Sequence, residues 1–291
     1  MIATIGFFDG VHRGHRYLLE QLKAEATSAG EPSLVVTFSN HPLNVIRSGY
    51  RHPLLSSPEE KVCLLHKAGV DRVELLDFDA RMMMMDSFHF MRDVMVERFG
   101  VSRLLIGYDN RIGHDRESTF DDYVRMGREI GLDVCLARER VLDGSKVSSS
   151  AIRDALLSGD ISTANMLLGY DYSLSGKVVG GFRNGRMLGF PTANIQPLFA
   201  DKLIPADGAY AVDVAVDGAT YRGMLNIGYR PTYSNGKDKS IEVHIIDFSG
   251  DIYAESISVS FRRFLRSERK FDSIDQLRMQ LLADREEARK G

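Results

Sequence analysis

The most constraining feature of this sequence is a change in the spacing of its apolar residues near Gly169. Before this point, short β-branched runs alternate with segments whose apolar residues recur every three to four positions, which is the helical period. After it the helical period disappears until the last residues of the chain. We therefore expect two domains, residues 1–168 and residues 169–291, and a chain of 291 residues is long enough for both.

The first half is expected to form an α/β domain around a parallel sheet. Strands separated by helices at this spacing imply right-handed β-α-β crossovers. Ser57, Pro58 and Glu60 form a capping-box pattern that predicts the start of one helix. The predicted strands are residues 2–6, 33–38, 72–78, 103–107 and 133–137, and the predicted helices are one that begins at Ser57 and those over residues 15–30, 87–99, 119–130, 149–157 and 161–168.

The second half is expected to be all-β, an antiparallel barrel or sandwich. Turn pairs such as Asp217-Gly218 and Asn235-Gly236 separate short β-rich segments. A charged helix over residues 272–290 should pack on it through one apolar face. The predicted strands are residues 210–216, 221–227, 241–246 and 252–261, and the predicted helix face is Ile274, Leu277, Leu281 and Leu282.

Composition excludes several classes of protein. A net charge of −3 does not indicate a nucleic-acid-binding surface. The two cysteines, Cys63 and Cys135, lie in no C-x-x-C pair, so a zinc or redox site is not indicated. Neither a signal peptide nor a membrane-spanning run is present, and we expect a cytoplasmic protein that binds small molecules, without a membrane or nucleic-acid partner, as a monomer or weak oligomer. The run Met82–Met85 is interpreted as packing filler in a soft loop, or else as an apolar interaction surface.

A phosphate-binding turn is predicted after the first strand. Gly10 and Gly14 allow the backbone to approach a ligand, and the free N–H groups of the following helix favour an anion. His12 and His15 flank the same turn and can donate hydrogen bonds to phosphate oxygens. The alternative is that these histidines only cap a helix.

A second polar cluster ends the first half. Ser148, Ser149 and Ser150 precede a predicted helix with Arg153 on its first turn, so hydroxyls, helix N–H groups and a guanidinium converge. Taken alone, the segment would be interpreted as a serine cap with a solvated arginine.

These two segments together resemble a known family. Gly-Phe-Phe-Asp-Gly-Val-His-Arg-Gly-His at residues 6–15, with Val-Ser-Ser-Ser-Ala-Ile-Arg at residues 147–153, resembles the Rossmann-like nucleotidyltransferase half of the bacterial bifunctional riboflavin kinase/FAD synthetases. The resemblance implies His12 and His15 at the ATP triphosphate. Residues 106–113 are similar to a family segment whose aspartate lies in the substrate cleft, which implies Asp109. The residues assigned to ATP or phosphate in this half are Asp9, Gly10, Gly14, Asp109, Ser148, Ser149 and Arg153.

The second half opens with a glycine- and arginine-rich segment, residues 176–194. Such cationic loops wrap phosphates, although no P-loop motif occurs in the chain. Thr192 and Asn194 offer neutral oxygens that suit a Mg²⁺ ion bridging nucleotide phosphates. A glycine-rich hairpin without a ligand is the alternative.

This segment resembles the riboflavin kinase barrel of the same family. The matching runs are Gly-Arg-Met-Leu-Gly-Phe-Pro-Thr-Ala-Asn at residues 185–194, Asn-Ile-Gly-Tyr-Arg-Pro-Thr at residues 226–232, Ile-Glu-Val-His at residues 241–244, and residues 265–271. The resemblance implies that Thr192 and Asn194 hold Mg²⁺ and ATP and that Glu242 is the base that accepts a proton from the riboflavin hydroxyl. Without the motif, Glu242 would be an outward strand carboxylate paired with Lys239 or His244. The remaining assignments in this half are Gly176, Gly181 and Arg186 to phosphate and Arg266 to flavin.

The resemblance implies a two-step enzyme. The barrel would transfer the γ-phosphate of ATP to riboflavin, giving FMN, and the first domain would join FMN to AMP from a second ATP, giving FAD and pyrophosphate. Two alternatives stay open: riboflavin kinase activity alone, and a non-catalytic relative that binds flavin or nucleotide. Two departures bear on them. The chain starts almost on its first strand, and Leu168-Gly169-Tyr170-Asp171-Tyr172 lacks the arginine and proline of the family's junction.

Overall fold

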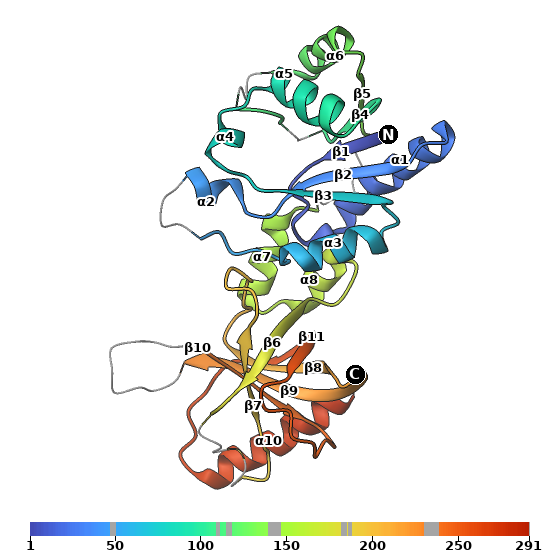
Figure 1. Ribbon diagram of the computed structural model, residues 1–291. Coiled ribbons are helices and arrows are strands. Elements are labelled where there is room, and N and C mark those ends of the chain that lie inside the picture. The colour runs from blue at the N-terminus through green and yellow to red at the C-terminus, as the bar shows by residue number, and fades with distance from the viewer. Residues whose placement is uncertain are drawn as a thin grey trace. The chain divides into compact units, whose positions relative to one another are not determined.

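The chain folds as two compact units, Met1–Ser149 and Ser150–Gly291 (Figure 1). The structure is a computed structural model that describes residues 1–46, 51–108, 111–114, 118–138, 147–181, 185, 188–229 and 239–290. The sequence places the domain boundary later, after residue 168. Two helices that the sequence assigns to the first domain, α7 (Ser149–Ser158) and α8 (Ile161–Leu168), lie almost wholly in the second compact unit.

The first unit is built on a five-stranded parallel sheet, as predicted. Its strand order is β3-β2-β1-β4-β5, and each neighbouring pair is parallel. β1 is central because the chain builds outwards through β2 and β3 on one side and then returns to the other side for β4 and β5. The strands are β1 (Ile2–Ile5), β2 (Ser33–Phe38), β3 (Arg72–Leu76), β4 (Arg103–Ile106) and β5 (Asp133–Leu136).

Helices cover both faces of this sheet. One apolar cluster joins Ala3 and Ile5 of β1 to the segment Ser87–Arg98 and to α6, and a second joins Ile2 and Val35 to α1 and α3. Figure 1 shows α5 and α6 on one side of the strands and α3 on the other. The helical elements of this unit are η1 (Asp9–Val11), α1 (Arg13–Ala29), α2 (Pro42–Ile46), α3 (Pro58–Lys67), α4 (Ala80–Met83), α5 (Ser87–His89), the π-helix η2 (Phe90–Arg98) and α6 (Phe120–Glu129).

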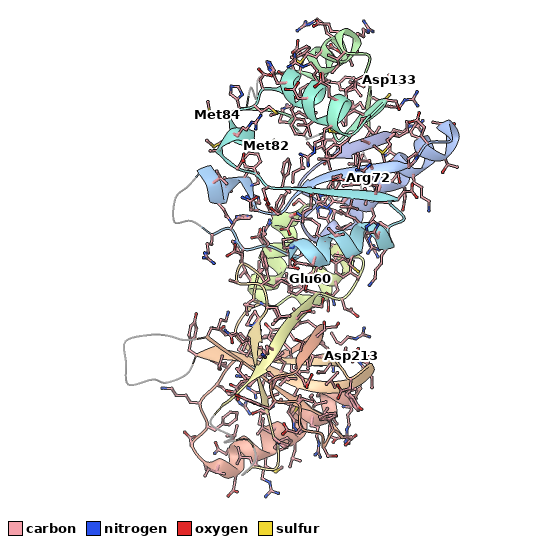
Figure 2. The ribbon with its side chains drawn as sticks, viewed as in Figure 1. Glu60, Arg72, Met82, Met84, Asp133 and Asp213 are labelled. Atoms are coloured by element: carbon pink, nitrogen blue, oxygen red, sulfur yellow. The ribbon has the colours of Figure 1, made fainter. Side chains whose placement is uncertain are left out.

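Local signals explain where these helices begin and end. The Ser57 side chain accepts from the Glu60 N–H and the Glu60 side chain accepts from the Ser57 N–H, which is the predicted capping box. Gly30 ends α1 with φ 64°, as its position predicted. In the methionine run, Met82 and Met85 pack on the first apolar cluster, whereas the side chain of Met84 is 67% exposed (Figure 2).

The second unit contains a closed six-stranded antiparallel barrel, so the barrel alternative is the correct one. Its strand order is β10-β7-β6-β11-β8-β9, and β9 pairs with β10 to close it. The strands are β6 (Ser173–Val179), β7 (Ala193–Pro197), β8 (Gly208–Val216), β9 (Ala219–Tyr229), β10 (Lys239–Ile245) and β11 (Ser256–Arg266), and the helix α10 (Ile274–Arg289) follows.

Three predictions about elements were wrong. The segment from residue 176 to 194 was interpreted as a loop, but its two ends belong to strands β6 and β7. Its β-branched residues pair in the barrel despite the glycines. The strand predicted from residue 252 starts at Ser256, after a turn in which Ala254 has φ 66°. Ile274 is 71% exposed and does not belong to the packing face of α10, whereas Leu281 and Leu282 do.

Candidate active sites

The predicted phosphate-binding turn lies at the carboxyl end of β1, the central strand of the first unit. In open α/β sheets, ligands bind outside the carboxyl ends of the strands where the strand order reverses, and β1 flanks that point. The turn is strained, since Phe8, Gly10 and Val11 have φ values of 52°, 71° and 38°. A β-branched residue rarely adopts positive φ, so the surrounding contacts must hold this backbone in place.

The two histidines of the turn stack on each other. Their ring centroids are 3.6 Å apart with an interplanar angle of 14°. His12 is the N-cap of α1, and its Nδ1 accepts the backbone N–H of His15 at 3.3 Å, so a neutral His12 carries its proton on Nε2. Burial, with the nearby charges of His12 and Lys61, lowers the pKa of His15 well below its usual value. His15 Nδ1 is buried and has no hydrogen-bond partner among the described residues.

Asp9 and the two glycines shape this turn. The Asp9 carboxylate is buried and accepts the backbone N–H groups of Leu55, at 2.9 and 3.1 Å, and Ser56, at 3.2 Å. Gly10 donates its N–H to Ser56 Oγ at 3.1 Å. A Cβ on Gly14 would lie 3.2 Å from the His12 ring. These contacts anchor the turn to the segment before α3, and direct phosphate contacts of Asp9, Gly10 and Gly14 stay a prediction.

The serine segment contacts the histidine turn. Ser149 Oγ donates to the Asp9 carbonyl at 3.2 Å, and the Val147 carbonyl lies 3.4 Å from where a Cβ on Gly14 would be. Ser148 directly precedes α7. Arg153 lies on α7 in the second compact unit, and Asp109 lies outside the described residues, so their roles stay predictions.

A buried lysine beneath the turn was not predicted from the sequence. Lys61 of α3 is 2% exposed, and its Nζ donates to the Phe7 carbonyl at 3.1 Å and to the Phe38 carbonyl at 2.6 Å. Burial lowers the pKa of Lys61 to about 8, and the carboxylate of Asp9 partly opposes that shift. The sequence places this lysine four residues before Leu65, on the buried face of a helix, and that position could have indicated that it is buried.

In the second unit, a pocket of about 590 Å³ opens between the barrel and α10. Its apolar walls include Phe190, Leu225 and Phe271, and its polar groups include Glu242 and Arg266. A large apolar pocket with a few convergent polar groups is the usual form of a small-molecule site.

A second pocket of about 610 Å³ lies next to the first, and Thr192 lines both. Its walls carry Gly180, Gly181, Asn194 and Tyr253. A Cβ on Gly181 would come within 2.0 Å of Asn194 Nδ2, so only glycine leaves room for that amide. Thus Gly181, Thr192 and Asn194 lie together on the wall of this pocket.

Glu242 lines the first pocket, beside Thr192. It is opposite Asn194 of β7 and Asn226 of β9 in the strand registers, and it accepts a hydrogen bond from Thr192 Oγ1 at 3.4 Å. The two partners that an outward-facing Glu242 would have used are engaged elsewhere. Lys239 forms an ion pair with Asp207 at 2.9 Å, and His244 Nδ1 bonds to the Pro191 carbonyl at 2.8 Å.

Arg266 borders the first pocket and is held by a buried carboxylate. Its Nε lies 2.9 Å from Asp284 Oδ2 and its second terminal nitrogen lies 2.8 Å from the same oxygen, while Gln280 donates to Asp284 Oδ1 at 2.6 Å. Asp284 is 5% exposed. Asp284 lies on the same face of α10 as Leu277, Leu281 and the buried Ala288. A carboxylate on an apolar helix face was the feature of the sequence that could have indicated this buried residue.

Two further predicted residues do not join this arrangement. Gly176 lies in β6 and does not line either pocket as described. A Cβ there would come within 2.2 Å of the Ile195 side chain, so packing between β6 and β7 accounts for the glycine. Arg186 lies outside the described residues.

His244 is a pocket residue that the sequence did not single out. It lines the first pocket and meets the Phe190 ring edge-on at 5.3 Å. Burial lowers the pKa of His244, which keeps the ring neutral, and its Nδ1–H then donates to the Pro191 carbonyl, directly before Thr192. The ring therefore helps to fix the backbone that presents Thr192.

Comparison with known proteins bears on both halves of the chain. A family model described as FAD synthetase matches residues 1–151, and one described as riboflavin kinase matches residues 168–291. Curated bifunctional riboflavin kinase/FMN adenylyltransferases are similar along the whole chain. The protein from Pseudomonas fluorescens is 37% identical over 97% of this chain and 90% of its own, and that from Escherichia coli K12 is 37% identical over 99% and 91%.

A solved structure, described as a macrolide-efflux protein from Streptococcus pneumoniae, has the same fold throughout. It is 33% identical and superposes with a TM-score of 0.89 over 99% of this chain and 94% of its own. Among the helices described in the present chain, none is long and apolar enough to cross a membrane. With both family models matched and relatives of this identity along its whole length, the chain belongs to the family of bifunctional riboflavin kinase/FMN adenylyltransferases.

Proposed function

We propose that the two reactions of this family take place at two separate sites in this chain, with riboflavin phosphorylated in the barrel and FMN adenylylated at the histidine turn. The observation that carries the proposal for the barrel is Thr192, which lines both pockets and donates to Glu242. Riboflavin would occupy the pocket with the apolar walls and ATP the neighbouring one, so that the γ-phosphate and the flavin hydroxyl meet beside Thr192.

The kinase step needs a base because a primary hydroxyl is a poor nucleophile. The Glu242 carboxylate accepts the hydroxyl proton while the ribityl oxygen forms its bond to the γ-phosphorus and the bond to the β-phosphate oxygen breaks, giving FMN and ADP. Thr192 holds the carboxylate in position through its hydrogen bond, and His244 fixes the backbone before Thr192. Arg266, oriented by Asp284, would position the flavin at the first pocket.

The residues present fit a Mg²⁺ ion in the ATP pocket. Thr192 and Asn194 offer a hydroxyl and an amide oxygen on one wall, and Gly181 leaves room for the Asn194 side chain. No cluster of three or more histidine, cysteine or carboxylate ligands occurs in the part of the chain that the structure describes. Such a sparse set of neutral oxygens suits Mg²⁺, which keeps several waters and takes its other ligands from nucleotide phosphates. Bound there, the ion would neutralise charge on the transferred phosphoryl group.

The adenylyl step needs no nucleophilic side chain. The FMN phosphate oxygen attacks the α-phosphorus of ATP, and the bond to the β-phosphate oxygen breaks to release pyrophosphate. The N–H groups at the start of α1 and the imidazole N–H donors of His12 and His15 face this charge and stabilise it by position. The Nδ1 of His15, which is buried and has no hydrogen-bond partner among the described residues, supports this placement, because such an atom is suited to a ligand.

Two single substitutions test this assignment. His15→Gln should stop FAD formation from FMN, because the imidazole that stacks on His12 and faces the triphosphate is lost, and should leave FMN formation from riboflavin within twofold. Glu242→Gln should lower FMN formation at least a hundredfold, as general-base catalysis contributes ~10²–10⁴-fold, and leave FAD formation from supplied FMN unchanged. Product chromatography with each substrate measures both. If either substitution stopped both reactions in a folded protein, the two sites would not be assigned as proposed.

A further inference from the structure

The buried Lys61 has no part in the assignments made so far, although it lies directly under the histidine turn. Its Nζ bonds to the carbonyl of Phe7, which leads into the strained residues 8–11, and to the carbonyl of Phe38 at the end of β2. It also lies 4.0 Å from the centre of the Phe7 ring, where a cation is attracted to the π face. One ammonium group therefore joins α3 to the carboxyl ends of two adjacent strands.

We propose that Lys61 is a positioning residue of the adenylyltransferase site. It fixes the backbone that enters the histidine turn, and it supplies a buried positive charge beneath the place where the ATP phosphates bind. This inference rests on the proposed assignment of that site. Lys61 does not touch the nucleotide, since it is 2% exposed and lies within the fold.

The positive charge of Lys61 and its hydrogen bonds make separate contributions to the site. A neutral amine still has two N–H groups, which suffice for the two carbonyls at 3.1 and 2.6 Å. The turn would keep its anchor after deprotonation, whereas the attraction for the triphosphate would be lost. An apolar side chain at position 61 would remove both. Charge and anchoring can therefore be separated by experiment.

The charged and titratable groups around Lys61 come from the turn and from the segment after β2. The turn contributes the carboxylate of Asp9, which favours the ammonium form, and the imidazoles of His12 and His15. The segment after β2 contributes His41, whose ring lies 4.7 Å from that of Phe7. Carboxyl and imidazole groups ordinarily ionise near pH ~4 and ~6.5. A loss of activity near pH 8 that disappears in the Lys61 variants therefore belongs to Lys61, whose pKa is about 8.

The experiment measures kcat/KM for ATP in FAD formation from FMN between pH 6.5 and 9.5, on the full-length protein, with FMN formation from riboflavin as the internal control. The unchanged protein should lose about tenfold as the pH rises through about 8, because the ammonium proton is lost there. Lys61→Arg, which keeps its charge, should not show this decline. Lys61→Met should be at least tenfold slower at pH 7 and should show no inflection.

Several outcomes would overturn the inference. A flat profile of the unchanged protein, or the same inflection in Lys61→Met, would contradict it. So would a Lys61→Met protein that forms FAD at the unchanged rate. If Lys61→Met loses its fold by circular dichroism, the comparison of the unchanged protein with Lys61→Arg still decides the role of the charge. If His15→Gln abolishes FAD formation while the Lys61 variants do not affect it, this inference alone fails. If His15→Gln has no effect, the site itself is misassigned.

Discussion

At the scale of single residues, the barrel site depends on how closely side chains can approach one another. Thr192 joins the two pockets, and Asn194 reaches its place only because Gly181 has no side chain. The adjacent Gly180 is different, since a Cβ there would meet only the Tyr253 ring, at 3.9 Å. Of these two neighbouring glycines, only Gly181 is needed to leave space for another side chain.

We predict that Gly181→Ala raises the KM for ATP in the kinase step about tenfold or more, because the new methyl group displaces the Asn194 amide. Gly180→Ala, the matched control, should change it less than twofold. Steady-state kinetics of FMN formation at saturating riboflavin measure both. Equal effects of the two substitutions would show that loop flexibility, and not space for Asn194, is what the glycines provide.

The sequence predicted the motif residues of the sites but not the residues that support them. His12, His15, Thr192, Asn194 and Glu242 could be named because their spacing matches a family pattern. Lys61, His244 and Asp284 act through backbone carbonyls or through another side chain. Such contacts join segments far apart in the sequence, and a lone polar residue on an apolar helix face indicates burial without saying what it touches.

At the scale of elements, α10 is part of the flavin pocket as well as a cover for the barrel. Leu277 and Leu281 of this helix line the pocket, and Asp284 holds Arg266 of β11. Asp284 is nearly inaccessible, and breaking a buried ion pair by removing one charge is costly because the other charge is left without compensation.

We predict that Asp284→Asn lowers the free energy of unfolding of the second unit by about 3 kcal/mol. It should also raise the KM for riboflavin several-fold, because Arg266 is no longer held at the pocket. Glu287→Gln is the matched control on the same helix. Its pair with Arg263 is exposed, so it should change stability by less than about 1 kcal/mol. Thermal unfolding and FMN formation measure the two effects, and equal destabilisation by both variants would contradict the importance of the buried pair.

The strands show where the spacing of apolar residues predicts secondary structure correctly and where it does not. All five strands of the parallel sheet were expected, because buried β-branched runs alternate with helices. β6 and β7 were missed as strands since their ends carry the glycines and polar residues of the ATP pocket. The barrel is closed by the pairing of β9 with β10. Whether the strands form a barrel or a sandwich depends on such pairing between strands, which the local sequence pattern does not predict.

At the scale of the whole molecule, the two predicted sites belong to different compact units. The histidine turn lies within Met1–Ser149 and both barrel pockets lie within Ser150–Gly291. The junction segment, residues 168–172, lacks the arginine and proline of the family. Its Asp171 pairs with Arg262 and accepts a hydrogen bond from Asn165 at 3.0 Å, both within the second unit. The domain boundary after residue 168 stays a prediction, and the two family models match residues 1–151 and 168–291.

The central claim is that each step has its own site, the adenylyl step at the histidine turn and the kinase step in the barrel. The most direct test mixes two variants, His15→Gln and Glu242→Gln, with riboflavin, Mg²⁺ and excess ATP, and follows riboflavin, FMN and FAD by chromatography. Neither variant alone should convert riboflavin to FAD. The first should stop at FMN, which the second can use, so the mixture should form FAD after FMN has accumulated. Failure of the mixture to form FAD, with both variants folded, would contradict the division of the two reactions between these sites.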